Sequence, residues 1–275
     1  MSTPGRPEGE GTPVHATVQQ APLRPGTAPA LQYVLRLGDT CLIHAQRLAE
    51  WCGRAPVLEE DIALANIALD LLGQARVLLS HAAVLDGQGH DEDALAFWRD
   101  EHDFRNLTLV ELPRGDFADA VVRNLLLSTW LKAIWAGLKA SADATLAGLA
   151  HKAIKEAAYH QRHAADWAVR LGRGTAESAA RLAAALQRAW PYTAEMFTAD
   201  AVDDAAQQAG LGPRGCDLLP AWLDEIAAVI DDAGTAMPVL GAFRSTGRLG
   251  RHSEHLGRLL CEMQHLPRSH PGAVW

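Results

Sequence analysis

From Leu31 onward, apolar residues recur at the spacing of amphipathic α-helices, and no run combines β-branched residues with strict alternation. Clusters that contain Gly and Pro interrupt this pattern and separate the helical segments. No unit repeats at a fixed period, which argues against a solenoid. The sequence therefore predicts an all-α fold, a helical bundle with additional helices, with helices at 31–52, 57–85, 91–111, 116–141, 143–171, 175–197, 216–233 and 252–266.

The segment 57–85 is apolar almost all round and leaves only a narrow polar stripe. A helix of this kind is typical of a position where several neighbours bury it. We therefore predict that 57–85 is the central helix of the bundle.

The first residues of the chain differ from the rest in composition. Residues 1–28 are rich in Pro, Gly, Thr and Ala and contain almost no large apolar side chains. Such a segment buries too little apolar surface to offset the entropy lost on ordering. We predict a disordered Pro/Gly-rich N-terminal tail at 1–28, followed by a single helical domain at 29–275.

Composition narrows the class of protein. The chain is 48% hydrophobic and 21% charged, which is typical of a globular protein, and its formal net charge of -8 argues against a nucleic-acid partner. Neither a long uninterrupted apolar stretch nor a signal-peptide core is present, so we predict a cytoplasmic protein that does not span a membrane. Four scattered cysteines, with no C-x-x-C pair, are predicted to be free, buried thiols: Cys41, Cys52, Cys216 and Cys261.

Polar residues on otherwise apolar helices raise the possibility of a di-iron site. A helical-bundle di-iron centre takes one Glu from each of two helices and a Glu-x-x-His pair from each of the other two. The carboxylates balance the charge of the two iron ions and bridge them, while each imidazole adds a neutral nitrogen donor. This requirement can be checked helix by helix.

The segment 57–85 has polar residues where a Glu-x-x-His pair would lie, but not the ligands. Asn66, Asp70 and Gln74 follow one another at one-turn spacing, and Gly73 occupies the position where a histidine would follow Asp70. A buried Asp70 needs a partner, because an unpaired buried charge costs several kcal/mol. The candidate partners on a facing helix are His160, Arg162 and Lys155.

The segment 116–141 lacks acidic ligands altogether. No Asp or Glu occurs between positions 120 and 142, and the polar residues along one line are Asn124, Ser128 and Lys132. A protonated lysine offers donors and no lone pair, so it cannot replace a bridging carboxylate. It could instead pair with acids that remain on other helices.

The segment 143–171 carries Glu156 and His160 one turn apart, while Tyr159 occupies the position three residues after Glu156. Glu156 and His160 can both face the core. They form either half of a metal site or a buried Glu–His hydrogen bond that orients the bundle. Because the other helices supply so few ligands, the hydrogen bond is the favoured interpretation.

Two further candidates lie near helix ends. Glu50 could be a ligand from 31–52, although a solvated carboxylate is the more common situation for an acid at such a position. Glu262 and His265 form a literal Glu-x-x-His just before Pro267, which is best explained as a chance match. We predict no catalytic and no metal-binding residue in this chain, and a vestigial di-iron-like pocket formed by Glu50, Asn66, Asp70, Ser128, Lys132, Glu156 and His160.

Several stretches together resemble a known family, the C subunits of ring-1,2-phenylacetyl-CoA epoxidase (phenylacetyl-CoA monooxygenase). The resemblance covers about residues 31–275 and is carried by LGDTCLIHAQRLAEWCGRAPVLEEDIALANIALDLLGQARVLL (37–79), GHDEDALAFWRDEHDFRNLTLVELPRGDFADAVVRNLLLSTW (89–130), AIKEAAYHQRHAADWAVRLGRGT (153–175) and SEHLGRLLCEMQHL (253–266).

The resemblance implies a ferritin-like fold and a place in a hetero-oligomeric oxygenase of aerobic phenylacetate catabolism, a form of aromatic compound degradation. In such a complex the catalytic A subunit holds the di-iron centre and binds phenylacetyl-CoA, and a reductase with a flavin and an iron-sulfur centre supplies electrons. The subunit that this chain resembles is structural and has no cofactor of its own. The expected partners are thus the A subunit and the other epoxidase subunits, including the reductase.

Two other functions remain open at this point. The chain could be a catalytic di-iron oxygenase subunit or a helical scaffold of an unrelated complex. The first would use Glu50, Asp70, Glu156 and His160, with Glu262 and His265 as a further candidate pair. The Gly-rich segment 234–250 is long for a loop, and it either contacts a partner or is a mobile surface loop.

Overall fold

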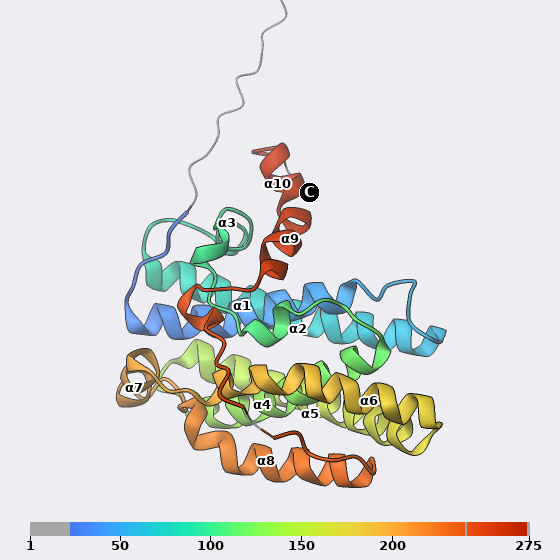
Figure 1. The fold of residues 1–275 in the computed structure, drawn as a ribbon. Helices are drawn as coiled ribbons and strands as arrows, with labels where there is room; N and C mark the ends of the chain where they lie inside the picture. Colours follow the sequence, from blue (N-terminus) through green and yellow to red (C-terminus); the bar gives the residue numbers. More distant parts are fainter. Residues whose placement is uncertain (1–22, 240, 274–275) are drawn as a thin grey trace, which may run out of the picture.

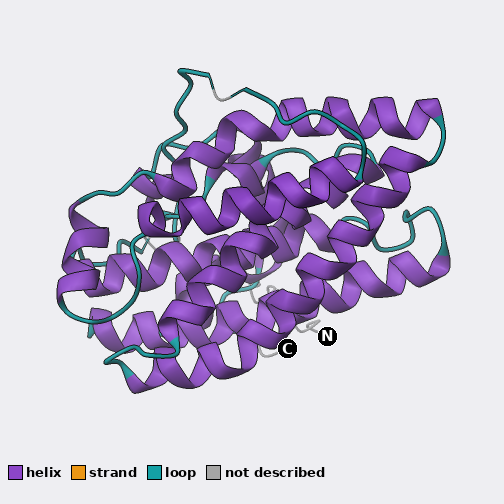
Figure 2. Cartoon of the chain, turned by 90° about the horizontal axis from the view of Figure 1, so that it is seen from below, coloured by secondary structure: helices purple, strands orange, loops and turns teal. Residues whose placement is uncertain are grey.

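The computed structural model describes residues 23–239 and 241–273. The all-α prediction is confirmed, because helices account for all the regular secondary structure of these residues (Figure 2). The α-helices are α1 (Pro29–Ala49), α2 (Leu58–Asp86), α3 (Glu92–Phe97), α4 (Phe117–Leu138), α5 (Ala144–Arg173), α6 (Ala176–Ala189), α7 (Ala201–Gln208), α8 (Gly215–Asp232), α9 (Glu254–Met263) and α10 (His265–Ser269). Short 3-10 segments are η1 (Glu101–Asp103), η2 (Thr108–Glu111), η3 (Trp190–Phe197) and η4 (Gly247–Leu249).

The long helices form two layers (Figure 1). The pair α1 and α2 forms one layer, and α4, α5, α6 and α8 form the other, with α9 and α10 beside the first layer. Several helices begin at side-chain caps that satisfy free backbone N–H groups; Asp116, for example, accepts a hydrogen bond from the backbone of Asp119 at the start of α4.

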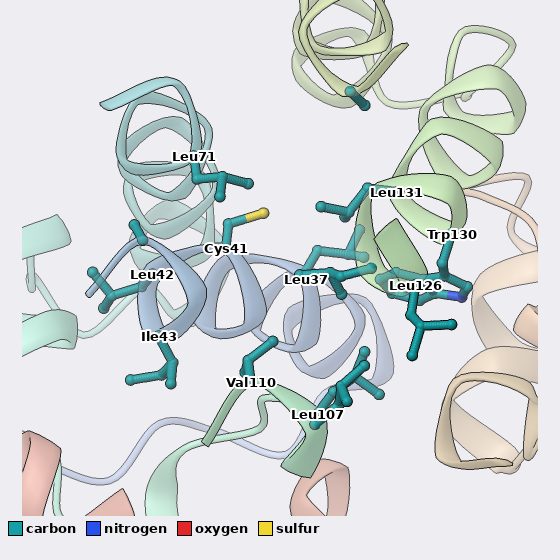
Figure 3. Close-up of a cluster of buried hydrophobic side chains, with 14 of the residues drawn as sticks. Leu37, Cys41, Leu42, Ile43, Leu71, Leu107, Val110, Leu126, Trp130 and Leu131 are labelled. Atoms are coloured by element: carbon teal, nitrogen blue, oxygen red, sulfur yellow. The ribbon is translucent and has the colours of Figure 1, made fainter. Parts of the chain in front are cut away.

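The central helix of the bundle is α1. Every residue from Leu31 to Ala45 is buried. Figure 3 shows why: Leu71 of α2, Leu126 and Trp130 of α4, and Leu107 beside η2 approach α1 from different sides. Even Asp39, at mid-helix, is fully buried, and it is paired with the equally buried Arg99.

The prediction that 57–85 is the central helix is wrong. In α2, Leu58 is 71% exposed, Leu69 64% and Val84 76%, although the opposite side of the helix packs on α1. By length and composition α2 alone among the described helices could cross a membrane, with a mean hydropathy of 1.5, but helices in soluble cores meet the same criterion. An apolar helix face predicts that the face is buried. It does not tell whether this chain or another protein buries it.

The predicted helix at 91–111 is also wrong, since only α3 and two 3-10 turns form there. Polar side chains of other elements accept hydrogen bonds from backbone N–H groups that would otherwise donate within a helix. Arg105 N–H donates to Asp39 Oδ2 at 2.8 Å, Leu107 N–H to Thr40 Oγ1 at 3.2 Å, and Thr108 N–H to Glu195 Oε2 at 3.0 Å. Tertiary hydrogen bonds therefore override the apolar spacing of this segment.

Smaller differences concern the end of the chain and its thiols. The predicted helix 175–197 becomes α6 followed by η3, and α7 forms where the sequence predicted none. In the segment 234–250, Glu195 accepts hydrogen bonds from Ser245 Oγ at 2.7 Å and Arg248 N–H at 2.8 Å, so this part is anchored. The four cysteines are free as predicted, but only Cys41 is buried; Cys216 is half-buried, and Cys52 and Cys261 are exposed.

The predicted tail at 1–28 lies mostly outside the described residues. Its last part contacts the domain: Leu23 N–H donates to the carbonyl of Trp98 at 3.0 Å, and Gly26 N–H to Asp86 Oδ1 at 2.8 Å. The helical region therefore begins with a short extended segment laid against α2 and α3.

Candidate functional site

Polar side chains, most of them buried, meet where α1, α2, α4 and α5 face one another. We call this group the core polar cluster, and it consists of Cys41 and His44 of α1, Asp70 and Gln74 of α2, Asn124 of α4, and Glu156 and His160 of α5. Four facing helices are also the arrangement that supplies the ligands of a helical-bundle di-iron centre.

Gln74 and Glu156 link α2 to α5. Gln74 is 2% exposed, and its Nε2 donates to Glu156 Oε2 at 2.9 Å. Its Oε1 accepts a weak hydrogen bond from the Cys41 thiol at 3.7 Å. The second Glu156 oxygen pairs with Lys152, one turn earlier on α5, at 3.2 Å. An amide thus occupies the position beside Glu156 where a metal ion would require another carboxylate or an imidazole.

His160 and Asp70 make a second link between the same helices. His160 Nε2 lies 3.1 Å from Asp70 Oδ2, so His160 is the partner of Asp70, one of the three predicted candidates. Two expectations fail here. The Asp70 side chain is 40% exposed rather than buried, and Glu156 hydrogen-bonds to Gln74 instead of His160. Burial, only partly offset by Asp70, lowers the pKa of His160 below its ordinary value.

His44 and Asn124 complete the cluster and were not predicted as site residues. His44 Nε2 lies 3.3 Å from Asn124 Oδ1, which can only accept, so this nitrogen carries the proton. Burial, together with the positive charge of Arg123, lowers the pKa of His44 to about 3. Burial also raises the pKa of the Cys41 thiol to about 12. His44 and Cys41 are therefore both neutral near pH 7, with His44 one turn after Cys41 on the buried side of α1.

The other predicted pocket residues lie in different surroundings. Glu50 caps the end of α1 and pairs with Arg47 at 2.5 Å, while Asn66 is exposed on α2. Ser128 donates to the carbonyl of Asn124 in its own helix. Lys132 pairs with Glu225 of α8 at 2.5 Å. The structure therefore brings Asp70, Glu156 and His160 together and places the remaining four residues elsewhere.

The literal Glu-x-x-His pair is split between two helices. Glu262 belongs to α9, and His265 begins α10 after a break at Gln264; both side chains are exposed. The two residues thus do not share one helical face of the bundle interior.

The donors of the core polar cluster do not fit a di-iron centre. Within residues 23–239 and 241–273, no three His, Cys, Asp or Glu side chains converge in a way that could hold a metal ion. The cluster offers two carboxylates, one of them well exposed, and its imidazoles lie against Asn124 and Asp70. Two carboxylates are too few to bridge two iron ions and balance their charge. The cluster acts instead as a hydrogen-bonded connection between helices.

The outer side of α2 is the second notable feature. Leu58, Ile62, Leu69, Leu72 and Val84 lie within about 120° of one another on a helical wheel. We call them the α2 apolar stripe; their exposed fractions range from 41% to 76%. Gly73, between them, has open space above it, since an added Cβ would meet nothing within 4 Å. The stripe runs along a helix of 29 residues, or about 43 Å.

Comparison with known proteins places the chain in a family. A family model described as phenylacetic acid catabolic protein matches residues 16–275. A curated relative from Escherichia coli (strain K12), which is named as the C subunit of 1,2-phenylacetyl-CoA epoxidase, is 50% identical over 243 residues, which cover 88% of this chain and 98% of the relative. The helical region of the chain has an all-α, ferritin-like architecture. The chain therefore belongs to the family of phenylacetic acid catabolic proteins.

Proposed function

We propose that this chain is a non-catalytic structural subunit of a multicomponent 1,2-phenylacetyl-CoA epoxidase and supports a di-iron catalytic A subunit. The observation that carries the proposal is the interior side of α4. It presents Asn124 and Ser128, and no Asp or Glu occurs anywhere between positions 120 and 142. A bundle in which one of the four core helices has no acid beyond its first turn cannot complete the ligand set of two iron ions.

The chemistry then belongs to other subunits. The A subunit would hold the di-iron centre and phenylacetyl-CoA, and a reductase with a flavin and an iron-sulfur centre would deliver electrons to it. The name of the Escherichia coli relative supports membership of such an epoxidase. We expect the assembly to work in the cytoplasm, in aerobic phenylacetate catabolism, and this chain to require no cofactor.

The α2 apolar stripe is the surface that we assign to the catalytic subunit. Exposed Leu and Val side chains along a whole helix are uncommon on a monomer, and obligate interfaces are rich in such side chains. Only part of the most apolar stretch of α2 is covered by this chain. A long helix from a partner could lie along the stripe and cover the remainder by ridge-into-groove packing.

This interface is tested by charge insertion. Leu69→Asp and Val84→Asp place a carboxylate in the proposed interface and should prevent co-purification with the A subunit, while each variant remains folded on its own. Val239→Asp is the matched control, because Val239 is 93% exposed outside the stripe, and it should assemble normally. Normal assembly of both stripe variants would exclude α2 as the interface.

The non-catalytic role is tested by iron analysis of the isolated, folded chain after washing with a chelator. We expect no stoichiometric iron. Retention of about two irons per chain would instead identify a catalytic di-iron oxygenase subunit. The third function, a scaffold of an unrelated complex, predicts that the folded chain fails to bind a well-folded A subunit.

A further inference from the structure

A pocket lies at the start of α4, away from the core polar cluster. It has a volume of about 270 Å³ and forms where the turn at 112–115, the first turns of α4 and the junction of α6 with η3 meet. Its charged lining residues are Asp119, Arg123 and Arg188. The proposed structural role of the chain uses none of these side chains, so they call for a separate explanation.

Arg123 lines this pocket although it is buried, with 5% of its surface exposed. Within the described part of the chain, its side chain makes a single hydrogen bond, from Nη2 to the carbonyl of Pro113. Nε is buried without an acceptor, and Nη1 also has none. Arg123 forms no ion pair with a carboxylate of residues 23–239 or 241–273. A buried guanidinium group thus keeps unused donors at the wall of the pocket.

The two carboxylates whose negative charge acts on Arg123 are already paired with other arginines. Asp119 Oδ1 accepts hydrogen bonds from Arg188 Nε at 2.9 Å and Nη2 at 2.7 Å. Glu50 is paired with Arg47 at 2.5 Å. In the lining of the pocket, two guanidinium groups therefore face one carboxylate, which leaves a single positive charge.

The remaining charge is unfavourable because it is buried. Burial lowers the pKa of Arg123 to about 10, and the positive charge of Arg47 acts in the same direction. An interior charge is costly unless an opposite charge lies beside it. An anion that enters the pocket would supply that charge and would accept hydrogen bonds from the unused donors of Arg123.

The rest of the pocket wall is largely apolar. Leu112, Pro113 and Ala189 contribute aliphatic side chains. Tyr192 adds an aromatic ring, which makes an edge-to-face contact with Phe243 at 5.2 Å between ring centroids. A strongly hydrated inorganic anion would gain nothing from these side chains, whereas an organic acid could bury its apolar part against them.

We propose that this pocket binds a small monocarboxylate, an organic acid with a compact apolar body. A planar guanidinium matches the two oxygens of one carboxylate, and the single positive charge of the pocket matches one anionic group. The volume lies just below the range of sites for drug-sized molecules, so the ligand has to be small. The site is independent of the role of this chain as an epoxidase subunit.

Calorimetric titration of the full-length chain with benzoate, in a buffer free of other carboxylates, tests the proposal. Benzoate is rigid, so it loses little conformational freedom on binding. We expect saturable binding with a dissociation constant below about 1 mM. Benzamide has nearly the same shape but no charge, and it should bind at least about tenfold more weakly.

Three variants check the charge of the site. Arg123→Gln removes the unpaired guanidinium group and should lower the affinity for benzoate at least about tenfold. Asp119→Asn removes the negative charge from the pocket wall and should raise the affinity severalfold. Arg214→Gln removes a guanidinium group at the start of α8 and should leave the affinity unchanged. Melting curves verify that each variant is folded.

Three results would overturn the proposal: no saturable binding of benzoate, equal affinity for benzoate and benzamide, or unchanged affinity of a folded Arg123→Gln variant. Tighter binding of inorganic phosphate or of a short glutamate-rich peptide would also overturn it, and would assign the pocket to a hydrated anion or to an acidic segment of a protein. The comparison of benzoate with benzamide needs no variant, so it decides the matter even if Arg123→Gln does not fold.

Discussion

Gln74 of α2 donates a hydrogen bond to Glu156 of α5 across 2.9 Å, in the interior where four long helices face one another. The Glu156 side chain is 14% exposed and the Gln74 amide is buried, so water has little access to replace this hydrogen bond. An amide–carboxylate pair provides a directed connection between helices without any metal ion. The same geometry makes Glu156 a useful position for measuring what the core polar cluster contributes.

Replacement of Glu156 by Ala should lower the free energy of unfolding by about 1–3 kcal/mol, because it leaves the buried Gln74 amide without its acceptor. Glu156→Gln retains an acceptor oxygen and should lose less. Urea unfolding curves measure both. Equal stability of the wild-type chain and Glu156→Ala would show that the hydrogen bond adds nothing. In the assembled complex, we expect the iron content of the partner subunit to be unchanged.

Removal of Asp39 should be more damaging. Asp39→Asn leaves the fully buried Arg99 guanidinium without a counter-charge and should cost about 3–5 kcal/mol. Glu225→Gln is the matched control: it breaks the partly exposed pair with Lys132 and should cost about 1 kcal/mol or less. Both values follow from denaturant unfolding, and similar losses for the two variants would contradict the importance of burial.

His44 should make the protein sensitive to acid. The folded state holds the pKa of His44 at about 3, below the ordinary 6.5, because of burial and the nearby Arg123. The unfolded state therefore binds a proton as the pH falls below about 6.5 while the folded state does not, so stability is lost in that direction.

The free energy of unfolding should fall by up to about 1.4 kcal/mol per pH unit because of His44. His160, whose pKa is also lowered in the folded state, should reduce stability in the same pH direction. Unfolding curves recorded between about pH 7.5 and about pH 5 give the free energy of unfolding as a function of pH. This free energy should fall less steeply with decreasing pH for His44→Gln than for the wild-type chain. An identical slope would mean that other groups account for the acid sensitivity.

Two glycines of α5 should respond to alanine in opposite ways. A Cβ at Gly172 would lie 2.1 Å from the carbonyl oxygen of Ala233, so Gly172→Ala should force α5 and α8 apart and cost about 1–3 kcal/mol. A Cβ at Gly148 would meet nothing within 4 Å, so Gly148→Ala should add about 0.5–1 kcal/mol through helix propensity. Melting temperatures that shift in the same direction would refute this interpretation of the helix contact.

The sequence predicted the long helices well because each has a continuous apolar face and clear end signals. The helices predicted at 57–85 and 143–171 correspond to α2 (Leu58–Asp86) and α5 (Ala144–Arg173). The failure at 91–111 has a different origin, since Asp39, Thr40 and Glu195 come from other parts of the chain and capture its backbone N–H groups. Local spacing carries no information about such distant acceptors.

The sequence predicted which site residues share a face of one helix, but not which residues of other helices they contact. The spacing of Glu156 and His160 indicated a common inward face, but their partners depended on the rotation of α2, which the sequence did not define. His44 was missed because a lone histidine on an apolar face looks like ordinary core. The polar line of α4 was interpreted as one unit, yet Lys132 turns to Glu225 on α8, whose position follows only from tertiary packing.

The exposed leucines of α2 also bear on how the protein is kept in the cell. Until a chain that binds its partner through such a surface is assembled, its apolar residues stay exposed. Chaperones bind such unassembled chains, and proteases remove them. The abundance of this subunit should then follow that of its partner rather than its own rate of synthesis. The exposed apolar side of α2 would thus require the cell to produce this chain and its partner in similar amounts.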